Sequence, residues 1–114
     1  MHELSVTENI LEIALRHAQK AQARQVKTIY LVVGQLASIV DDSVQFYWEL
    51  ISADTIAEHA SLNFRRIPAV LECLSCGHNF PLDGSDLVCV QCGSAEIKVI
   101  AGEEFYVEAI DVET

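Results

Sequence analysis

The hydrophobic pattern near the start of the chain predicts an amphipathic helix. Over residues 4–23, apolar positions recur close to every 3.6 residues, which is the period of one face of an α-helix. Ser5 and Glu8 have the spacing of a capping box, in which the two side chains satisfy N–H groups at a helix start. We therefore predict that the helix begins near Val6 and that residues 1–3 lie just outside it, near its positive end.

The pattern that follows predicts a strand, a second helix and two more strands. Residues 26–33 are rich in β-branched and aromatic side chains and stop at Gly34, which is typical of a strand. A helix through about Ile51 is predicted next, and its N-cap candidates are Asp41, Asp42 and Ser43. Residues 61–67 and 103–112 are predicted to form strands.

Residues 68–97 contain every cysteine of the chain and show no helical period. This segment is predicted to be an insert folded around a metal, after which the last strand returns to the main body. The order of elements predicts an α+β fold, a three-stranded β-sheet with two α-helices plus a small zinc-ribbon-like β insert. We expect one domain from residues 1–68 with 98–114, and a zinc-binding insert with four cysteines from residues 69–97.

The cysteines form two pairs, Cys73-x-x-Cys76 and Cys89-x-x-Cys92, and a glycine follows each pair. Two intervening residues allow one tight turn to direct both sulfurs at one ion, and glycine allows the backbone to curl after it. Two such turns supply four soft thiolates in a tetrahedron, which favours Zn(II). Because four thiolates leave no position for water or substrate, we predict a structural zinc site.

Two other uses of these cysteines are less consistent with the pattern. A pair of disulfides is disfavoured in a reducing cytosol. A thioredoxin-like redox site needs one reactive CxxC in a βαβ context, whereas this chain has two in a β-like segment. His78 follows Cys76 directly and is predicted to be a solvated loop residue, not a fifth ligand.

Composition and charge restrict the function classes. The chain of 114 residues carries 7 Lys plus Arg against 17 Asp plus Glu, a formal charge of -10. This balance argues against nucleic acid and suits basic partner surfaces or cations. The sequence has no apolar run of about 18 residues that could span a membrane. Residues 1–5 have no basic flank or apolar core of a secretory signal, so we expect a cytoplasmic protein.

The N-terminal residues offer a second set of metal ligands. A free α-amine at Met1, the amide nitrogen of His2 and its imidazole can close fused chelate rings around one ion. The amide nitrogen of Glu3 can complete a planar set of four nitrogens, which suits Ni(II) and Cu(II) and not zinc. The alternative, on composition alone, is a frayed terminus without function.

Taken together, these motifs resemble those of the HypA/HybF family of nickel metallochaperones, which help to mature [NiFe]-hydrogenases. The resemblance covers essentially the whole chain and rests on Met1–Ser5, Val33–Leu36, Phe46–Glu49, Thr55–Glu58 and the two CxxC-Gly motifs. It implies that His2 is the essential nickel ligand, that Glu3 belongs to the same site, and that the cysteines hold structural zinc. The main domain would then be the nickel-binding domain.

The resemblance also implies partners, namely a HypB-type nickel GTPase and the hydrogenase large-subunit precursor, and it permits a role in urease maturation. The sequence departs from the family at residues 41–43, where Asn-Pro-Glu or similar is frequent. His17 and His59 match no motif and are interpreted as surface residues. The choice between a monomer and a homodimer is left open.

Two functions from other classes remain as alternatives. One is a zinc-ribbon protein-interaction module without a nickel role. The other is an enzyme that uses His2 and Glu3 as acid and base. The enzyme is the weakest hypothesis, because a closed zinc site offers no Lewis acid and the sequence shows no nucleophile–base pair or phosphate loop. We therefore predict a protein that is not an enzyme.

Overall fold

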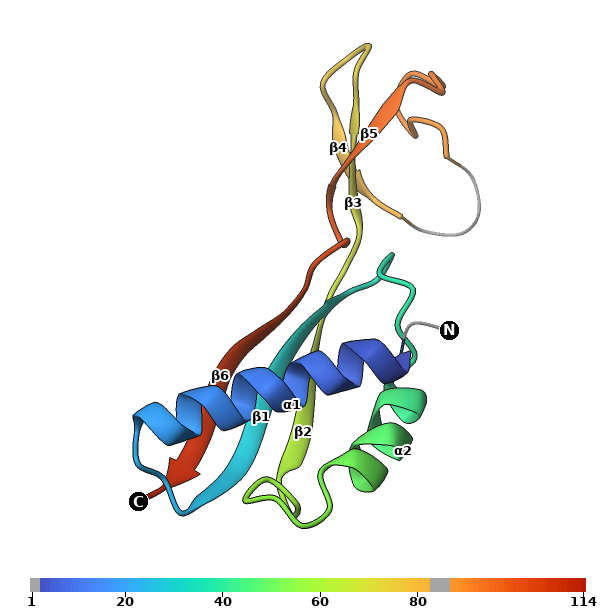
Figure 1. Cartoon of the computed structure of the whole chain (residues 1–114). Helices are drawn as coiled ribbons and strands as arrows, with labels where there is room; N and C mark the ends of the chain where they lie inside the picture. The colour runs from blue at the N-terminus through green and yellow to red at the C-terminus, as the bar shows by residue number, and fades with distance from the viewer. Residues whose placement is uncertain (1–2, 83–86) are drawn as a thin grey trace. The chain divides into compact units, whose positions relative to one another are not determined.

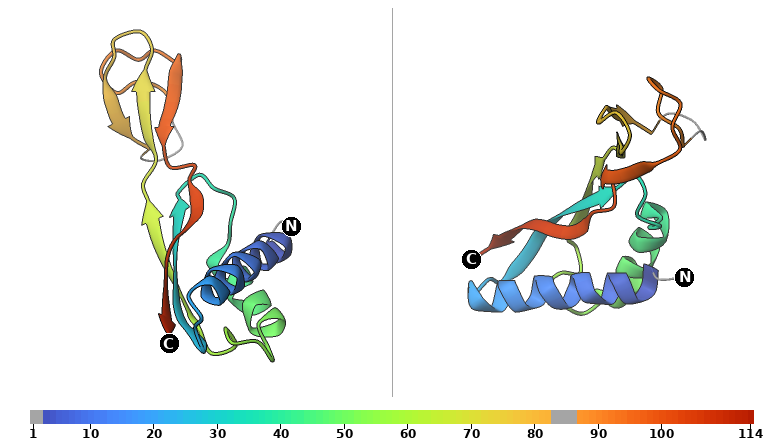
Figure 2. Two further views of the ribbon diagram at one scale, coloured as in Figure 1. Left: turned by 60° about the vertical axis from the view of Figure 1, so that its left-hand side comes forward. Right: turned by 90° about the horizontal axis from the view of Figure 1, so that it is seen from above.

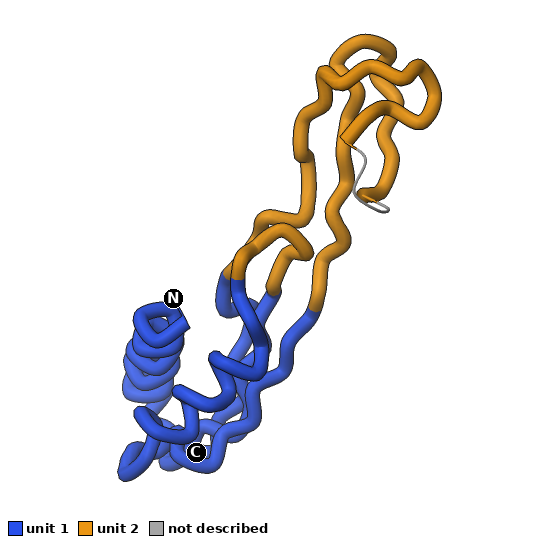
Figure 3. Tube along the Cα trace, turned by 90° about the vertical axis from the view of Figure 1, so that its right-hand side faces the viewer, with its two compact units in different colours: residues 1–32, 39–65, 106–114 blue, residues 33–38, 66–105 orange. Residues whose placement is uncertain are grey.

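The computed structural model describes residues 3–82 and 87–114. The chain divides into two compact units (Figure 3). Unit 1 comprises residues 1–32, 39–65 and 106–114, and unit 2 comprises residues 33–38 and 66–105. The assignment of separate nickel and zinc domains, with boundaries after residues 68 and 97, stays a prediction.

Helix α1 spans Glu3–Lys20 and begins earlier than predicted. Its buried stripe consists of Glu3, Thr7, Ile10, Ala14 and Ala18, spaced by three and four residues. The predicted start near Val6 was wrong, since Ser5 and Glu8 lie inside the helix. The first turn is held instead by Glu3, whose carbonyl accepts a hydrogen bond from the Thr7 hydroxyl.

The C-terminal end of α1 is closed by a Schellman motif. The N–H of Ala23 donates to the carbonyl of Ala18 at 2.9 Å, and the N–H of Gln22 donates to that of Gln19 at 3.1 Å. Gln22 has a φ of 54°, the left-handed conformation that this motif requires. Glycine usually occupies this position. Because the chain has glutamine there, the sequence does not show where the helix ends. The predicted end at Ala23 was therefore three residues too late.

The sheet of unit 1 contains the three predicted long strands. Strands β1 (Gln25–Gly34), β2 (Ser61–Ile67) and β6 (Phe105–Glu113) lie in the order β2-β1-β6. In Figures 1 and 2, β1 and β2 run in the same direction and β6 runs opposite to them. Both helices lie on one face of this sheet (Figure 2). This arrangement confirms the predicted three-stranded sheet with two helices.

Helix α2 spans Asp41–Ile51 and connects the parallel strands β1 and β2. Its N-cap is Val40, which makes no side-chain capping hydrogen bond, so the prediction of an Asp or Ser cap was wrong. Asp41 and Asp42 lie instead in the first helical turn, where acidic groups interact favourably with the helix dipole. Trp48 is 1% exposed, and its indole Nε1 has no hydrogen-bond partner among the described residues.

Unit 2 contains a small antiparallel sheet that the insert prediction anticipated only as β-like. Its strands β3 (Val70–Cys73), β4 (Asn79–Pro81) and β5 (Ile97–Ala101) lie in the order β4-β3-β5. Leu71 is paired with Phe80 on one side and with Val99 on the other. The core of this sheet is small, because its buried members are Leu71, Phe80 and the two cysteines Cys73 and Cys89.

Backbone segments approach one another closely in unit 2. A Cβ added to Gly34 would lie 2.1 Å from the carbonyl oxygen of Gly102. The N–H of Leu36 donates to that same oxygen at 2.7 Å. A Cβ on Gly102 would lie 2.5 Å from the Cα of Ala69. The three backbones can therefore stack only because no side chain separates them.

We expect Gly34→Ala to lower the free energy of unfolding by about 1–3 kcal/mol, as overpacking of a filled interior does. Chemical denaturation with excess zinc would measure this loss. Gly77→Ala is the comparison, because nothing lies within 4 Å of its added Cβ and only its left-handed φ of 79° opposes the change. A Gly34→Ala protein as stable as the unaltered chain would contradict the close approach.

Candidate metal centre

Two turns of similar geometry present the four cysteines. In the first turn, the N–H of Gly77 donates to the carbonyl of Cys73 at 2.9 Å; in the second, the N–H of Gly93 donates to that of Cys89 at 2.8 Å. Gly77 and Gly93 have φ values of 79° and 76°, which a side chain would disfavour. The glycine after each pair thus has the role that the sequence predicted.

The sulfur atoms of the four cysteines lie close together. All four lie within 4.8 Å of one another. The Sγ atoms of Cys73 and Cys92 are 3.5 Å apart, and those of Cys76 and Cys89 are 3.6 Å apart. A tetrahedron with Zn–S bonds of about 2.3 Å has sulfur separations of about 3.8 Å. The cluster therefore fits zinc with thiolate ligands and leaves no open coordination position.

Backbone N–H groups favour the charged form of the two buried thiols. The amide of Cys76 lies 3.4 Å from the Cys73 sulfur, and the amides of Gln91 and Cys92 lie 3.3 and 3.4 Å from that of Cys89. The Cys76 amide is the main reason that the pKa of Cys73 is lowered to about 6, against the opposing effect of burial. The pKa of Cys89 is also lowered, because the amide bonds outweigh its desolvation.

The two exposed thiols, Cys76 and Cys92, have raised pKa values instead. A backbone hydrogen bond from His78 lowers the pKa of Cys76, but burial and the neighbouring thiols outweigh it and raise that pKa to about 12. The Ser94 amide likewise opposes the rise at Cys92, whose pKa is raised chiefly by Cys73 and by burial. Four neighbouring sulfurs cannot all be anionic without a cation, so a metal ion would have to displace protons from this cluster.

The second predicted metal site lies at the N-terminus. Met1 and His2 fall outside the described residues, whereas Glu3 is described. Glu3 is 8% exposed, and its carboxylate accepts a hydrogen bond from the amide of Val40 at 3.4 Å. The burial of Glu3 and its contact with the start of α2 were not predicted, because no local pattern connects residues 37 positions apart.

The other histidines agree only partly with the sequence interpretation. His17 is exposed on α1, and the side chain of His59 is 79% exposed, as expected for surface residues. His78 differs, because it is half-buried and its ring is stacked on Phe80 with centroids 6.0 Å apart. His78 does lie in a loop, between β3 and β4, but its stacking on Phe80 leaves it only partly solvated. Phe80, two positions away on β4, was the only sequence signal for this packing.

A family model and individual relatives identify the same family for this chain. The family described as "Hydrogenase/urease nickel incorporation, metallochaperone, hypA" matches residues 1–112. The hydrogenase maturation factor HypA of Dehalococcoides mccartyi is 48% identical over 113 residues, covering 99% of this chain and 95% of that protein. That of Geobacter metallireducens is 37% identical over 113 residues, covering 99% of this chain and 100% of that protein.

Two solved structures share the fold. The solution structure of the nickel metallochaperone HypA from Helicobacter pylori superimposes with a TM-score of 0.68 at 23% identity, covering 99% of this chain and 98% of that one. A second solution structure of a HypA protein gives a TM-score of 0.74 at 24% identity, covering 98% and 96%.

The fold and the sulfur cluster define a small α+β protein with a zinc-ribbon-like metal centre. The family match over residues 1–112 identifies the protein more specifically than the fold does. The chain belongs to the HypA family of nickel-incorporation metallochaperones of hydrogenase maturation. None of its described helices is long and apolar enough to cross a membrane.

We expect zinc binding to the apoprotein at pH 7 to release protons, at least those of Cys76 and Cys92, because their pKa values are raised. Lowering the pH should weaken zinc binding, since protons compete for the same sulfurs. Calorimetry in buffers of different ionisation enthalpy measures the number released. Zinc affinity that is unchanged from about pH 8 to about pH 6 would show that the thiols are not the ligands.

We expect Cys89→Ala to lose zinc and to disorder the small sheet of unit 2, because Cys89 is both a cluster member and part of that core. The described core of unit 1 contains no cysteine, so its unfolding should change little. Zinc analysis and amide exchange would report the two units separately. Ser75→Ala, a polar change within the first turn, is the matched control and should retain zinc. Full zinc occupancy in Cys89→Ala would contradict the assignment.

Proposed function

We propose that this chain binds Ni(II) at its N-terminus, through His2, Glu3 and the Met1 amine, and delivers the ion during [NiFe]-hydrogenase maturation. The proposal includes a structural Zn(II) held by Cys73, Cys76, Cys89 and Cys92. Membership of the HypA family supports the nickel role. The observation on this chain that carries the proposal is the position of Glu3 in the first turn of α1.

That position places the Glu3 amide at the start of the helix, outside the ladder of i to i−4 hydrogen bonds. The first N–H groups of an α-helix have no carbonyl four residues earlier to bind. The amide nitrogen of Glu3 can therefore serve as a ligand without breaking a helical hydrogen bond. A chelate of the amine, two amide nitrogens and the imidazole would give the planar nitrogen set that Ni(II) accepts. Deprotonated amides would bring negative charge that offsets the ion.

The Glu3 carboxylate already has a role in the fold. It contacts the amide of Val40 at the start of α2, close to the positive ends of two helices. The positive helix ends repel a cation, and the negative charge of the Glu3 carboxylate reduces this repulsion. We infer that Glu3 contributes its amide to nickel and its negative charge to the surroundings. Attraction by the carboxylate and repulsion by the helix ends would partly cancel, which suits an ion that has to be released.

Nickel binding would also depend on pH. Protons compete for the imidazole, with an unperturbed pKa of about 6.5, and for the α-amine, at about 7.7–8.0. Nickel affinity should therefore fall as the pH falls through this range. Cu(II) should bind at least as tightly by the general affinity order. Selectivity would then come from metal supply and from partner proteins.

The remaining parts of the proposal follow the family. The partners would be a HypB-type nickel GTPase and the hydrogenase large-subunit precursor. The cytoplasmic location expected from the sequence suits four cysteines that must stay reduced. The closed sulfur cluster offers no open coordination position to a substrate, which favours a carrier over an enzyme. The main alternative is an interaction module that binds zinc only.

We expect nickel binding to require both His2 and a free α-amine. Calorimetric titration of zinc-loaded protein with Ni(II) would compare the unaltered chain, an N-terminally extended chain and His2→Ala. The two altered proteins should lose the site. Glu3→Gln keeps the amide and should bind nickel with a smaller loss, while His59→Ala, which removes an exposed imidazole elsewhere, is the matched control.

Equal affinity and stoichiometry in the unaltered, extended and His2→Ala proteins would place nickel elsewhere, for example at His17, His59 or His78. That result would remove the main chemical support for nickel delivery from the N-terminus. Loss of binding in His59→Ala but not in His2→Ala would have the same meaning.

A further inference from the structure

Helix α2 exposes a row of apolar side chains that the fold does not use. Phe46 is 61% exposed and Leu50 is 60% exposed. The two residues are four positions apart, so they lie on the same face of the helix. Tyr47 packs edge-on against Phe46, with ring centroids 5.4 Å apart. We call Phe46, Tyr47 and Leu50 the α2 ridge.

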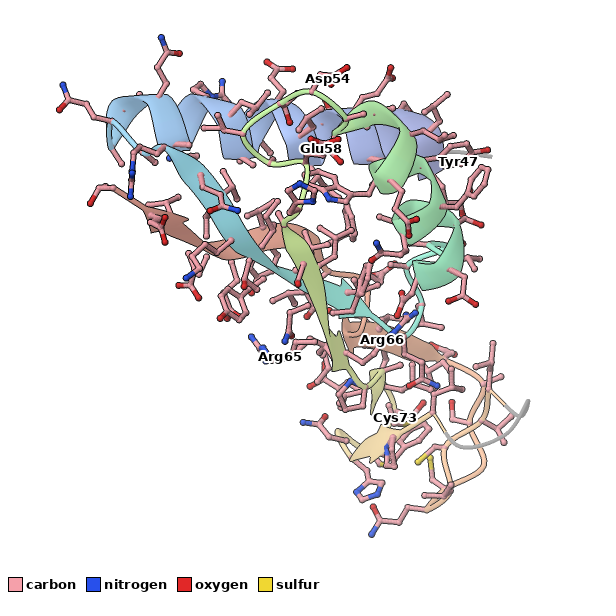
Figure 4. All side chains as sticks on the ribbon, turned by 90° about the horizontal axis from the view of Figure 1, so that it is seen from below. Tyr47, Asp54, Glu58, Arg65, Arg66 and Cys73 are labelled. Atoms are coloured by element: carbon pink, nitrogen blue, oxygen red, sulfur yellow. The ribbon has the colours of Figure 1, made fainter. Side chains whose placement is uncertain are left out.

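The α2 ridge points away from the protein interior. The buried face of α2 is formed by Val44 and Trp48, and Figure 4 shows Tyr47 on the outer side of the helix, directed away from the sheet. Exposed large apolar side chains that adjoin one another usually mark an interaction site. Phenylalanine and tyrosine are frequent anchors of such interfaces because they bury much area at little entropic cost.

Acidic groups border this ridge. Asp42 precedes Phe46 by four residues and Glu49 follows it by three, so both lie beside Phe46 on the exposed face. Gln45 donates a hydrogen bond from Nε2 to the Glu49 carboxylate at 3.3 Å. The helix contains no lysine or arginine. A complementary surface would have an apolar pocket with a rim of Lys or Arg side chains.

The negative charge around the α2 ridge limits which kind of partner could cover it. A second copy of this chain would bring the same acidic rim and the same net charge of -10 to the contact, which is unfavourable. An anionic membrane surface would also repel the rim. A cationic protein surface remains, and it could be steered to the ridge by long-range attraction.

The ridge also adjoins the proposed nickel site. The Glu3 carboxylate contacts the amide of Val40, the N-cap of α2. Phe46 is six residues further along, about 9 Å at about 1.5 Å per residue. A protein that covers the ridge would therefore lie near Glu3, the described residue of the proposed nickel site. This proximity is what transfer between two proteins requires, because a released ion is otherwise lost to water.

We propose that the α2 ridge docks the protein that receives the nickel, through an apolar pocket rimmed by basic side chains. This inference rests on the proposed function, since it takes the N-terminus as the nickel site. The recipient is the hydrogenase large-subunit precursor. Phe46 is the central anchor, Leu50 extends the contact, and Asp42 and Glu49 orient the basic rim.

The test measures binding of the purified large-subunit precursor to zinc-loaded, nickel-free full-length chain by biolayer interferometry. We expect Phe46→Gln and Leu50→Gln to weaken binding about tenfold, as the loss of an interface anchor does. Glu49→Lys should slow association about fivefold at low ionic strength, and salt should reduce this difference. Circular dichroism would verify the helix in each variant.

Two matched controls lie outside the ridge. Tyr106→Gln alters another exposed aromatic residue, on β6, and Glu103→Lys makes the same charge change in unit 2. Both should bind the precursor as the unaltered chain does. Unchanged binding in Phe46→Gln and Leu50→Gln would overturn the proposal. Equal losses in the controls, or no binding by the unaltered chain, would also overturn it.

Two further measurements separate this inference from the nickel proposal. Phe46→Gln should titrate with Ni(II) as the unaltered chain does, because the ridge supplies no ligand. If His2→Ala binds nickel normally, the proposed nickel site is wrong. The docking result would still hold, because it is measured without nickel. If Phe46→Gln weakens only binding to the nickel GTPase, the assigned occupant is wrong.

Discussion

The four-sulfur cluster is the constraint on which the folding of unit 2 depends. The buried members of its core are two apolar side chains and two cysteines, so half of these members also carry ligand atoms. A segment of this size cannot bury enough apolar surface to offset the entropy of ordering its backbone. A metal bound by the cluster would supply the missing free energy, because in such small modules the free energy of binding is largely free energy of folding. The turn amides around Cys73 and Cys89 prepare the site by favouring two of the four thiolates.

Glu3 connects the fold of unit 1 with the proposed chemistry of the N-terminus. Its carboxylate, beside the amide of Val40, joins the first turn of α1 to the start of α2. A change of the Glu3 side chain would therefore affect both the contact between the helix ends and the charge near the proposed nickel site. Reduced nickel binding in a Glu3 variant is then not by itself evidence that the carboxylate is a ligand.

Local signals in the sequence were sufficient for the two helices, for strands β1, β2 and β6 and for the cysteine cluster, but not for the individual strands of unit 2. Strong periodicity identified both helices, and the CxxC-Gly spacing identified the turns, because each depends on residues that are neighbours in the chain. Features set by distant contacts were missed. The contact of the Glu3 carboxylate with Val40 joins residues 37 positions apart, and the approach of Gly34 to Gly102 joins residues 68 positions apart.

The buried indole of Trp48 gives this protein a spectroscopic property of its own. It is the only tryptophan in the chain, it lies in the core of unit 1, and its Nε1 has no partner among the described residues. An indole in such apolar surroundings emits at short wavelength, and emission shifts to the red when water reaches it. Intrinsic tryptophan fluorescence therefore follows unit 1 alone, while the ultraviolet absorption of a metal held by the thiolates would follow unit 2. In metal-loaded protein, one unlabelled sample would then report the unfolding of each unit separately.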